Sequence, residues 1–207
     1  MAEMAVNGLR LYGVATLAHT DDRPLVDSTA VVTLRDIGAI VRPSSYTLPP
    51  LDDAEMLDCQ RVVEAVFRAH TILPAPCGTV FKSEDHIRRW LELNYVALVE
   101  GIHFVDGRCE ARVHVSDLPG DDVDGNDPDH VSLATECFRA LRKFAVAALP
   151  IRPEEGRILS GAYLVDRAEY ADFEGRVKEQ ARRAAGLRFQ LTGPWPPYDF
   201  VRLDFGA

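Results

Sequence analysis

The sequence lacks the features that mark most specialised protein classes. Its apolar runs, such as Phe144–Leu149, are far shorter than the roughly 20 residues that a membrane-spanning helix needs. The N-terminal residues show no basic segment followed by an apolar core, so no export signal is indicated. The cysteines are few and form no CxxC pair; they are Cys59, Cys77, Cys109 and Cys137. We therefore expect a cytoplasmic protein with reduced cysteines and no transmembrane segment.

Positive charge is also scarce. The 207 residues include 32 Asp and Glu against 23 Lys and Arg, which gives a net charge of −9. Binding to nucleic acid needs clustered cations that neutralise phosphates, and an anionic membrane surface repels an acidic protein. The composition argues against both partners. Because 47% of the residues are hydrophobic, the chain can still build one large core or two small ones.

The local motifs of catalysis and cofactor binding are missing. The sequence contains no HExxH, GxSxG, GxGxxG or Walker A pattern, and its six histidines do not stand at zinc-ligand spacing. The acidic loop 117–131 invites a calcium interpretation that starts at Asp122. Where an EF-hand loop has Gly at position 6 and Glu at position 12, however, this chain has Asp127 and Leu133. We expect a solvated connector there, no metal, no cofactor and no catalytic residue.

Hydrophobic periodicity predicts an α+β fold with two small domains, 1–106 and 107–207. In the first domain we expect strands at 11–17, 29–34 and 37–41, a helix over 54–70, a strand at 78–81 and a helix capped by Ser83. In the second we expect a strand at 109–116, a helix from Ser132, strands at 149–152 and 158–166, a helix over 169–185 and a strand at 187–191. This β-α-β-β-α-β order is the ferredoxin-like arrangement, followed here by a tail rich in proline and aromatic residues.

The tail is the first of two segments that look suited to an interaction. Proline removes backbone donors and fixes φ, so this run cannot be helix and makes a poor interior strand. It is either a strap over a sheet edge or over the seam between the domains, or an aromatic patch that faces a partner. The candidate interaction or inter-domain strap residues are Pro194, Trp195, Pro196, Pro197, Tyr198 and Phe200.

The second segment is the proline-bracketed link 71–81 between a helix and a strand. Its simpler interpretation is a helix stop followed by a core strand, with no binding role. Both segments also carry a resemblance to a known family.

Motifs in a constant order along nearly the whole chain resemble the gas vesicle protein F/L family (GvpF/GvpL). They are Leu11–Gly13, Ile37–Val41, Thr71–Phe81, Gly107–Val115 with Glu110, Gly161–Asp166 and the terminal Thr192–Tyr198. The chain departs from the family pattern at the run Leu73–Gly78, where an Arg and a Phe are replaced by Pro76 and Cys77. It also has His114 where Lys is common and Asp199 where Ser is common.

The resemblance implies a non-enzymatic accessory or minor structural protein of gas vesicle assembly. Such a protein would bind the small hydrophobic shell protein, and work with other gas vesicle accessory proteins, to prevent aggregation or to nucleate the shell. It would be found in the cytoplasm and at the gas vesicle. The alternative is a small-molecule-binding protein or enzyme on a ferredoxin-like scaffold, which requires a deep polar pocket with converging histidines or carboxylates.

Overall fold

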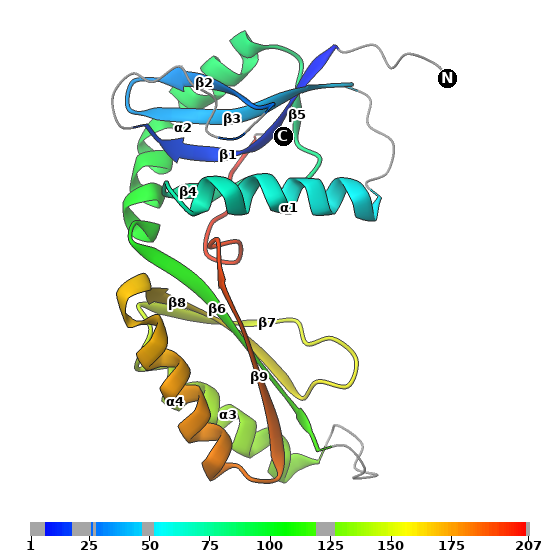
Figure 1. Ribbon diagram of the computed structural model, residues 1–207, viewed down its shortest axis with the longest axis vertical. Helices are drawn as coiled ribbons and strands as arrows, with labels where there is room; N and C mark the ends of the chain where they lie inside the picture. Colours follow the sequence, from blue (N-terminus) through cyan, green and yellow to red (C-terminus); the bar gives the residue numbers. More distant parts are fainter. Residues whose placement is uncertain (1–6, 18–25, 27, 47–51, 119–126, 206–207) are drawn as a thin grey trace. The chain divides into compact units, whose positions relative to one another are not determined.

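A computed structural model describes residues 7–17, 26, 28–46, 52–118 and 127–205 (Figure 1). These residues form two antiparallel sheets and four α-helices, which confirms the predicted α+β class. The chain divides into two compact units, Met1–Asp106 with Val201–Ala207, and Gly107–Phe200. The predicted second domain ran to residue 207, whereas the end of the tail groups with the first unit.

The first unit is built on a sheet with the strand order β2-β3-β1-β4, in which β5 also pairs with β1. Its elements in chain order are β1 (Gly8–Thr16), β2 (Ala30–Leu34), β3 (Ile37–Ser44), α1 (Asp53–Phe67), β4 (Ile72–Pro74), β5 (Val80–Phe81) and α2 (Glu84–Val105). Asp52 caps α1 and Ser83 caps α2 through their side-chain oxygens.

Helices lie against both faces of this sheet. Leu11 belongs to a hydrophobic core with Leu91 and Ile102 of α2. The next residue, Tyr12, points the opposite way and donates a hydrogen bond to Asp58 of α1. This explains why β1 is buried along most of its length, as a strand covered on both faces must be.

Two expectations for this unit were wrong. Ile72–Pro74 is a buried strand that pairs with β1, not part of an irregular link. A three-residue strand is too short to leave a pattern in sequence, and its Pro74 is tolerated because β4 lies at the edge of the strand order β2-β3-β1-β4. Cys59 and Cys77 are joined by a disulfide, whereas reduced thiols were predicted. The pairing crosses from α1 to the turn after β4, which only the tertiary structure brings together.

The second unit has the element order β-α-β-β-α-β and the sheet order β7-β8-β6-β9. Its elements are β6 (Arg108–Asp117), α3 (Pro128–Arg142), β7 (Ala147–Ile151), β8 (Leu159–Asp166), a short 3-10 turn η1 (Arg167–Glu169), α4 (Tyr170–Arg183) and β9 (Leu187–Trp195). Pairing between neighbouring strands is antiparallel throughout.

Both helices of this unit pack on one face of its sheet. Tyr163 of β8 is buried between Phe138 of α3 and Phe173 of α4, with ring centroids 5.3 and 5.1 Å away. Gly161 lies on the same face, and a Cβ atom there would stand 2.3 Å from the Phe138 ring. Ala111 pairs with Tyr163, so the alternate residues of β6, Glu110 and Arg112, point to the helix-free face.

Two element boundaries in this unit differ from the prediction. Helix α3 begins at Pro128, because Asp127 caps it and proline suits the first helical position; the prediction began it at Ser132. Strand β9 continues through Gly193 and Pro194 to Trp195, past the predicted end at 191. Most of the acidic loop, residues 119–126, and with it most of the calcium-like pattern, lies outside the described residues.

Candidate functional site

The main polar feature of the second unit is a buried carboxylate. Glu110 of β6 is 0% exposed, although it lies on the helix-free face of the sheet. Its Oε1 accepts a 2.6 Å hydrogen bond from Nε of Arg112, and its Oε2 accepts a 2.8 Å bond from the backbone N–H of Asp199. A buried carboxylate is tolerated only when its oxygens are satisfied in this way.

Arg112 closes the cluster through the Asp199 side chain. Its Nη2 lies 3.0 Å from Asp199 Oδ2, and its Nε lies 3.1 Å from the same oxygen. Asp199 thus donates its backbone N–H to Glu110 and accepts from Arg112 through its carboxylate. The three residues, which we call the Glu110 anchor, hold a chain segment 87 residues further along against β6.

Burial raises the pKa of Glu110 from 4.5 to about 7, although the Asp199 N–H and the Arg112 guanidinium both favour the ionised form. Between these two values the folded chain holds more protons at Glu110 than the unfolded chain does. The free energy of unfolding therefore falls as the pH rises through this window, and the loss is complete above the folded-state pKa.

The candidate segment continues directly from the edge strand β9. Pro194 is exposed, Trp195 is half-buried and pairs with Glu110 across the strands, and its indole N–H donates to Thr192 Oγ1 at 3.1 Å. Pro196 and Pro197 are buried, while Tyr198 and Phe200 are half-buried. The aromatic side chains are thus partly covered.

Gly193 allows the chain to turn into this segment. Its φ is +126°, and an added Cβ atom would lie 2.8 Å from the Glu110 carbonyl oxygen, so only glycine fits. The Gly193–Pro194 peptide bond is cis. The register between β6 and β9 also shifts here, between Glu110 and Arg112. Proline is accepted in the strand because β9 is an edge strand and the ladder is interrupted at this point.

After the Glu110 anchor, the tail is held in the first unit by aromatic contacts. The rings of Trp90 and Phe205 are stacked with centroids 5.2 Å apart, and Phe81 contacts both. The Trp90 indole N–H donates to the backbone oxygen of Asp204 at 2.7 Å. Val201, Leu203 and Phe205 all pack against the core of this unit. We call this contact the Trp90 anchor.

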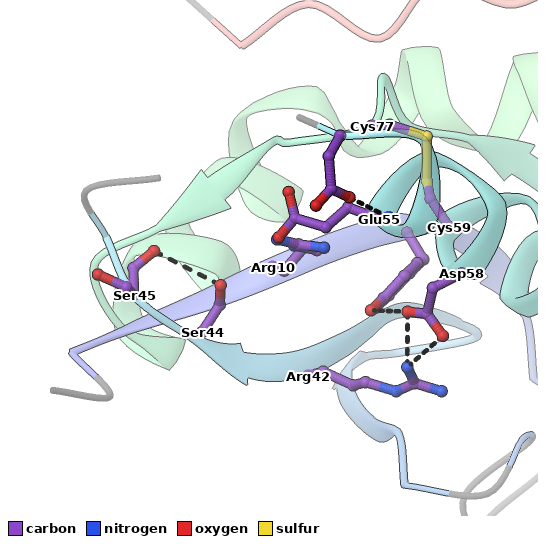
Figure 2. A network of polar contacts seen from close by, with 10 residues as sticks. Arg10, Arg42, Ser44, Ser45, Glu55, Asp58, Cys59 and Cys77 are labelled. Carbon is purple, nitrogen blue, oxygen red and sulfur yellow. Dashed lines mark hydrogen bonds and ion pairs between the residues drawn. A yellow bond between two sulfur atoms is a disulfide. The ribbon is translucent and has the colours of Figure 1, made fainter. Parts of the chain in front are cut away.

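Figure 2 shows how α1 is fastened to the first sheet by charge and to the turn after β4 by the disulfide. Arg10 of β1 pairs with Glu55 at 2.9 Å, and Arg42 of β3 pairs with Asp58 at 2.8 Å. Cys59 lies one residue beyond Asp58 and bonds to Cys77. The cluster joins three elements of one unit and leaves its charges paired, so it is a structural tie.

One Ser–His pair stands on the helix-free face of the second sheet. Ser160 Oγ lies 2.8 Å from Nδ1 of His114, and Nη1 of Arg157 lies 2.6 Å from the same nitrogen. Burial and the adjacent guanidinium lower the pKa of His114. An imidazole beside a fixed cation is a poor acceptor for a serine proton, and Ser160 is only 2% exposed. The pair is therefore not arranged for nucleophilic catalysis.

Two open grooves flank α4. The larger, about 820 Å³, is lined by charged side chains that include Asp172, Arg176 and Glu179, with Arg176 stacked on Phe144. The smaller, about 340 Å³, lies between α4 and β9 and is lined mainly by apolar side chains.

The part of the chain that the structure describes contains no group of three His, Cys, Asp or Glu able to hold a metal ion. Within the same residues no helix is long and apolar enough to cross a membrane.

The anchors were only partly visible in the sequence. Glu110 and the terminal segment both stood out as family motifs, but nothing connected them. Asp199 is a departure from the family pattern, and Arg112 belongs to none of the candidate site residues. A charged residue two positions from Glu110 on an alternating strand was the available signal, since residues i and i+2 share a face.

The fold and these anchors define a two-unit α+β protein whose C-terminal segment is held first by a polar contact and then by an aromatic one. The sequence matches the profile of the family described as "Gas vesicle synthesis protein GvpL/GvpF" over residues 8–122 and 129–202. The chain belongs to this family, which acts in gas vesicle formation.

Individual relatives agree with this assignment. The chain is 24% identical to gas vesicle protein F1 of Halobacterium salinarum, covering 85% of this chain and 82% of that protein. It is 28% identical to gas vesicle protein L of a Streptomyces species, covering 73% and 72%. In fold it is similar to the crystal structure of GvpF from an Anabaena species, with a TM-score of 0.77, 18% identity, and coverage of 96% and 99%.

Proposed function

We propose that this protein is a non-enzymatic accessory factor that binds the small hydrophobic shell protein of the gas vesicle. Its family membership over most of its length carries the proposal. A shell protein apolar enough to border a gas space aggregates in water unless a partner covers its apolar surface. A partner with a net charge of −9 keeps such a complex dispersed and allows controlled nucleation of the shell. It would act in the cytoplasm and at the forming vesicle, alongside other accessory proteins.

We further propose that the second unit is a ferredoxin-like domain and that 1–106 and 107–207 are the two domains of the chain, with the end of the tail returning to the first. The β-α-β-β-α-β order, the sheet order β7-β8-β6-β9 and the placement of α3 and α4 on one face support the ferredoxin-like class.

Within this function, residues 194–200 act as a strap. The burial of Pro196 and Pro197 and the double use of Asp199 support this role over that of a freely exposed patch. A segment whose backbone and side chains are committed to the Glu110 anchor holds its own unit together and leaves only part of its aromatic surface for a partner.

The binding proposal is tested by co-expressing the tagged chain with the shell protein of the same organism. We expect the shell protein to remain in the supernatant after centrifugation and to co-purify with the tag. An unrelated acidic protein of similar size and charge is the control. If the shell protein sediments equally with both and co-purifies with neither, the proposed function is wrong.

The strap role is tested with Trp195→Ala and Tyr198→Ala, assayed well below the unfolding temperature. A strap predicts a lower unfolding temperature and unchanged recovery of the shell protein. Lost recovery with an unchanged unfolding temperature would identify the segment as the docking surface instead.

A further inference from the structure

The two edges of the second sheet are protected differently. Strand β7 has five residues, and Pro150 removes a backbone donor from it. Strand β9 pairs with β6 alone among the described residues. From Leu187 to Thr192 it holds no proline, and its register with β6 is unbroken. An edge of this kind presents unpaired N–H and C=O groups to a further strand.

A groove lined by apolar side chains and by the Lys178–Glu174 ion pair runs along this same edge. Phe189 and Leu191 of β9 face it from one side, and Val177 and Ala181 of α4 from the other. Because its lining comes from α4 and β9 and not from β6, the groove of about 340 Å³ lies at the outer edge of the sheet. A strand added to β9 would place every second side chain in this groove.

Charge decides which kind of strand fits. Arg188 and Gln190 are exposed on the opposite face of β9 from Phe189. On α4, Lys178 beside this groove is paired with Glu174, whereas Arg182 lines the larger groove on the other flank of the helix. Arg188 therefore adds a positive charge to this edge, in a chain whose net charge is −9. A second copy carries the same net charge of −9, and the mutual repulsion of two such chains disfavours self-pairing.

We propose that the β9 edge and its groove bind an extended strand of another polypeptide, with apolar side chains at alternate positions and an acidic residue opposite Arg188. This inference rests on the proposed function, since the apolar gas vesicle shell protein is the partner with the matching chemistry. Backbone hydrogen bonds to β9 supply affinity, and the groove and Arg188 select the side chains.

The test uses the full chain co-expressed with the shell protein. Ala181→Glu puts a carboxylate in the groove and Arg188→Glu reverses the edge charge; Arg139→Glu, on the exposed side of α3, is the charge-matched control. We expect each edge variant to reduce recovery of the shell protein about tenfold, as for a residue central to an interface, and the control to leave it unchanged. Circular dichroism and the unfolding temperature verify that each variant is folded.

Amide hydrogen exchange of the complex provides a second readout. Strand addition protects backbone amides of residues 187–192 when the partner is bound and leaves those of β7 unchanged. If the shell protein binds but β9 gains no protection, or if Leu93→Glu on the exposed face of α2 abolishes binding while the edge variants do not, this inference is wrong and the proposed function stands. Protection of β9 in a homodimer that forms without the shell protein would also overturn this inference. If the wild-type chain does not bind the shell protein at all, both the inference and the proposed function are wrong.

Discussion

The two ends of the C-terminal segment are held by opposite kinds of contact. Residues 199 and 110 meet through charged hydrogen bonds on an open sheet face, whereas residues 205 and 90 meet through stacked rings on a hydrophobic core. The polar contact is directional and fixes the position of the strap, but it depends on which groups are ionised. The aromatic contact is less directional and depends on buried area. One segment therefore combines a contact that specifies position with one that stabilises by burial.

Removing the Trp90 ring should have the largest effect. Trp90 is 6% exposed and contacts both Phe81 and Phe205, so Trp90→Ala should lower the free energy of unfolding by about 3–5 kcal/mol. Denaturant titration measures the change. Trp90→Phe keeps a ring but loses the N–H that donates to the Asp204 backbone oxygen, and it should lower the free energy of unfolding much less. Equal losses would show that the hydrogen bond, not burial, holds the tail.

Reducing the Cys59–Cys77 disulfide should have the next largest effect, confined to the first unit. The bond closes a loop of 18 residues, and such a loop contributes on the order of 3 kcal/mol by restricting the unfolded chain. When hydrogen exchange is measured with and without reductant, the reductant should speed exchange in α1 and β4 and leave the exchange rates of β6 and β9 unchanged. A Cys109→Ser variant serves as control, because that thiol is free and lies in the second unit. Unchanged exchange in α1 would contradict the prediction.

Breaking the Glu110 anchor should lower the free energy of unfolding somewhat less than reducing the disulfide does. Arg112→Ala leaves a fully buried carboxylate with only the Asp199 N–H as partner, and an uncompensated buried group of this kind costs about 2–3 kcal/mol. The unfolding midpoint in urea reports the loss. Arg108→Ala, which breaks the more exposed pair with Asp166, is the matched control and should cost under about 1 kcal/mol. Similar losses would mean that the anchor behaves as a surface ion pair.

The smallest effect is a pH dependence that only the polar contact has. Because the folded-state pKa of Glu110 is raised to about 7, stability should decline as the pH rises from about 4.5 to 7. Glu110→Gln cannot ionise and should flatten that decline, while Trp90→Phe should leave its slope unchanged. Unfolding curves at several pH values measure both slopes. A steeper decline in Glu110→Gln would reverse the assignment.

Most of the elements followed from periodicity, and the failures have physical causes. The helix with Ile87, Leu91, Leu98 and Ile102 on one stripe was predicted because 3.6-residue spacing is a local property. Strand β4 was missed because a strand of only three residues leaves no period to read. The disulfide was missed because reduced thiols were expected, and because its pairing depends on how α1 meets the turn after β4.

The sequence by itself determined the α+β class, most of the elements and the resemblance to the gas vesicle family, because these rest on local spacing and on motifs along the chain. Only the tertiary structure decided what the terminal segment does with its side chains. Glu110 and Asp199 are 89 residues apart, and their contact exists because β9 returns beside β6 and Gly193 turns the chain onto the helix-free face. The open edge of β9 is likewise a property of strand order, which no single strand reveals.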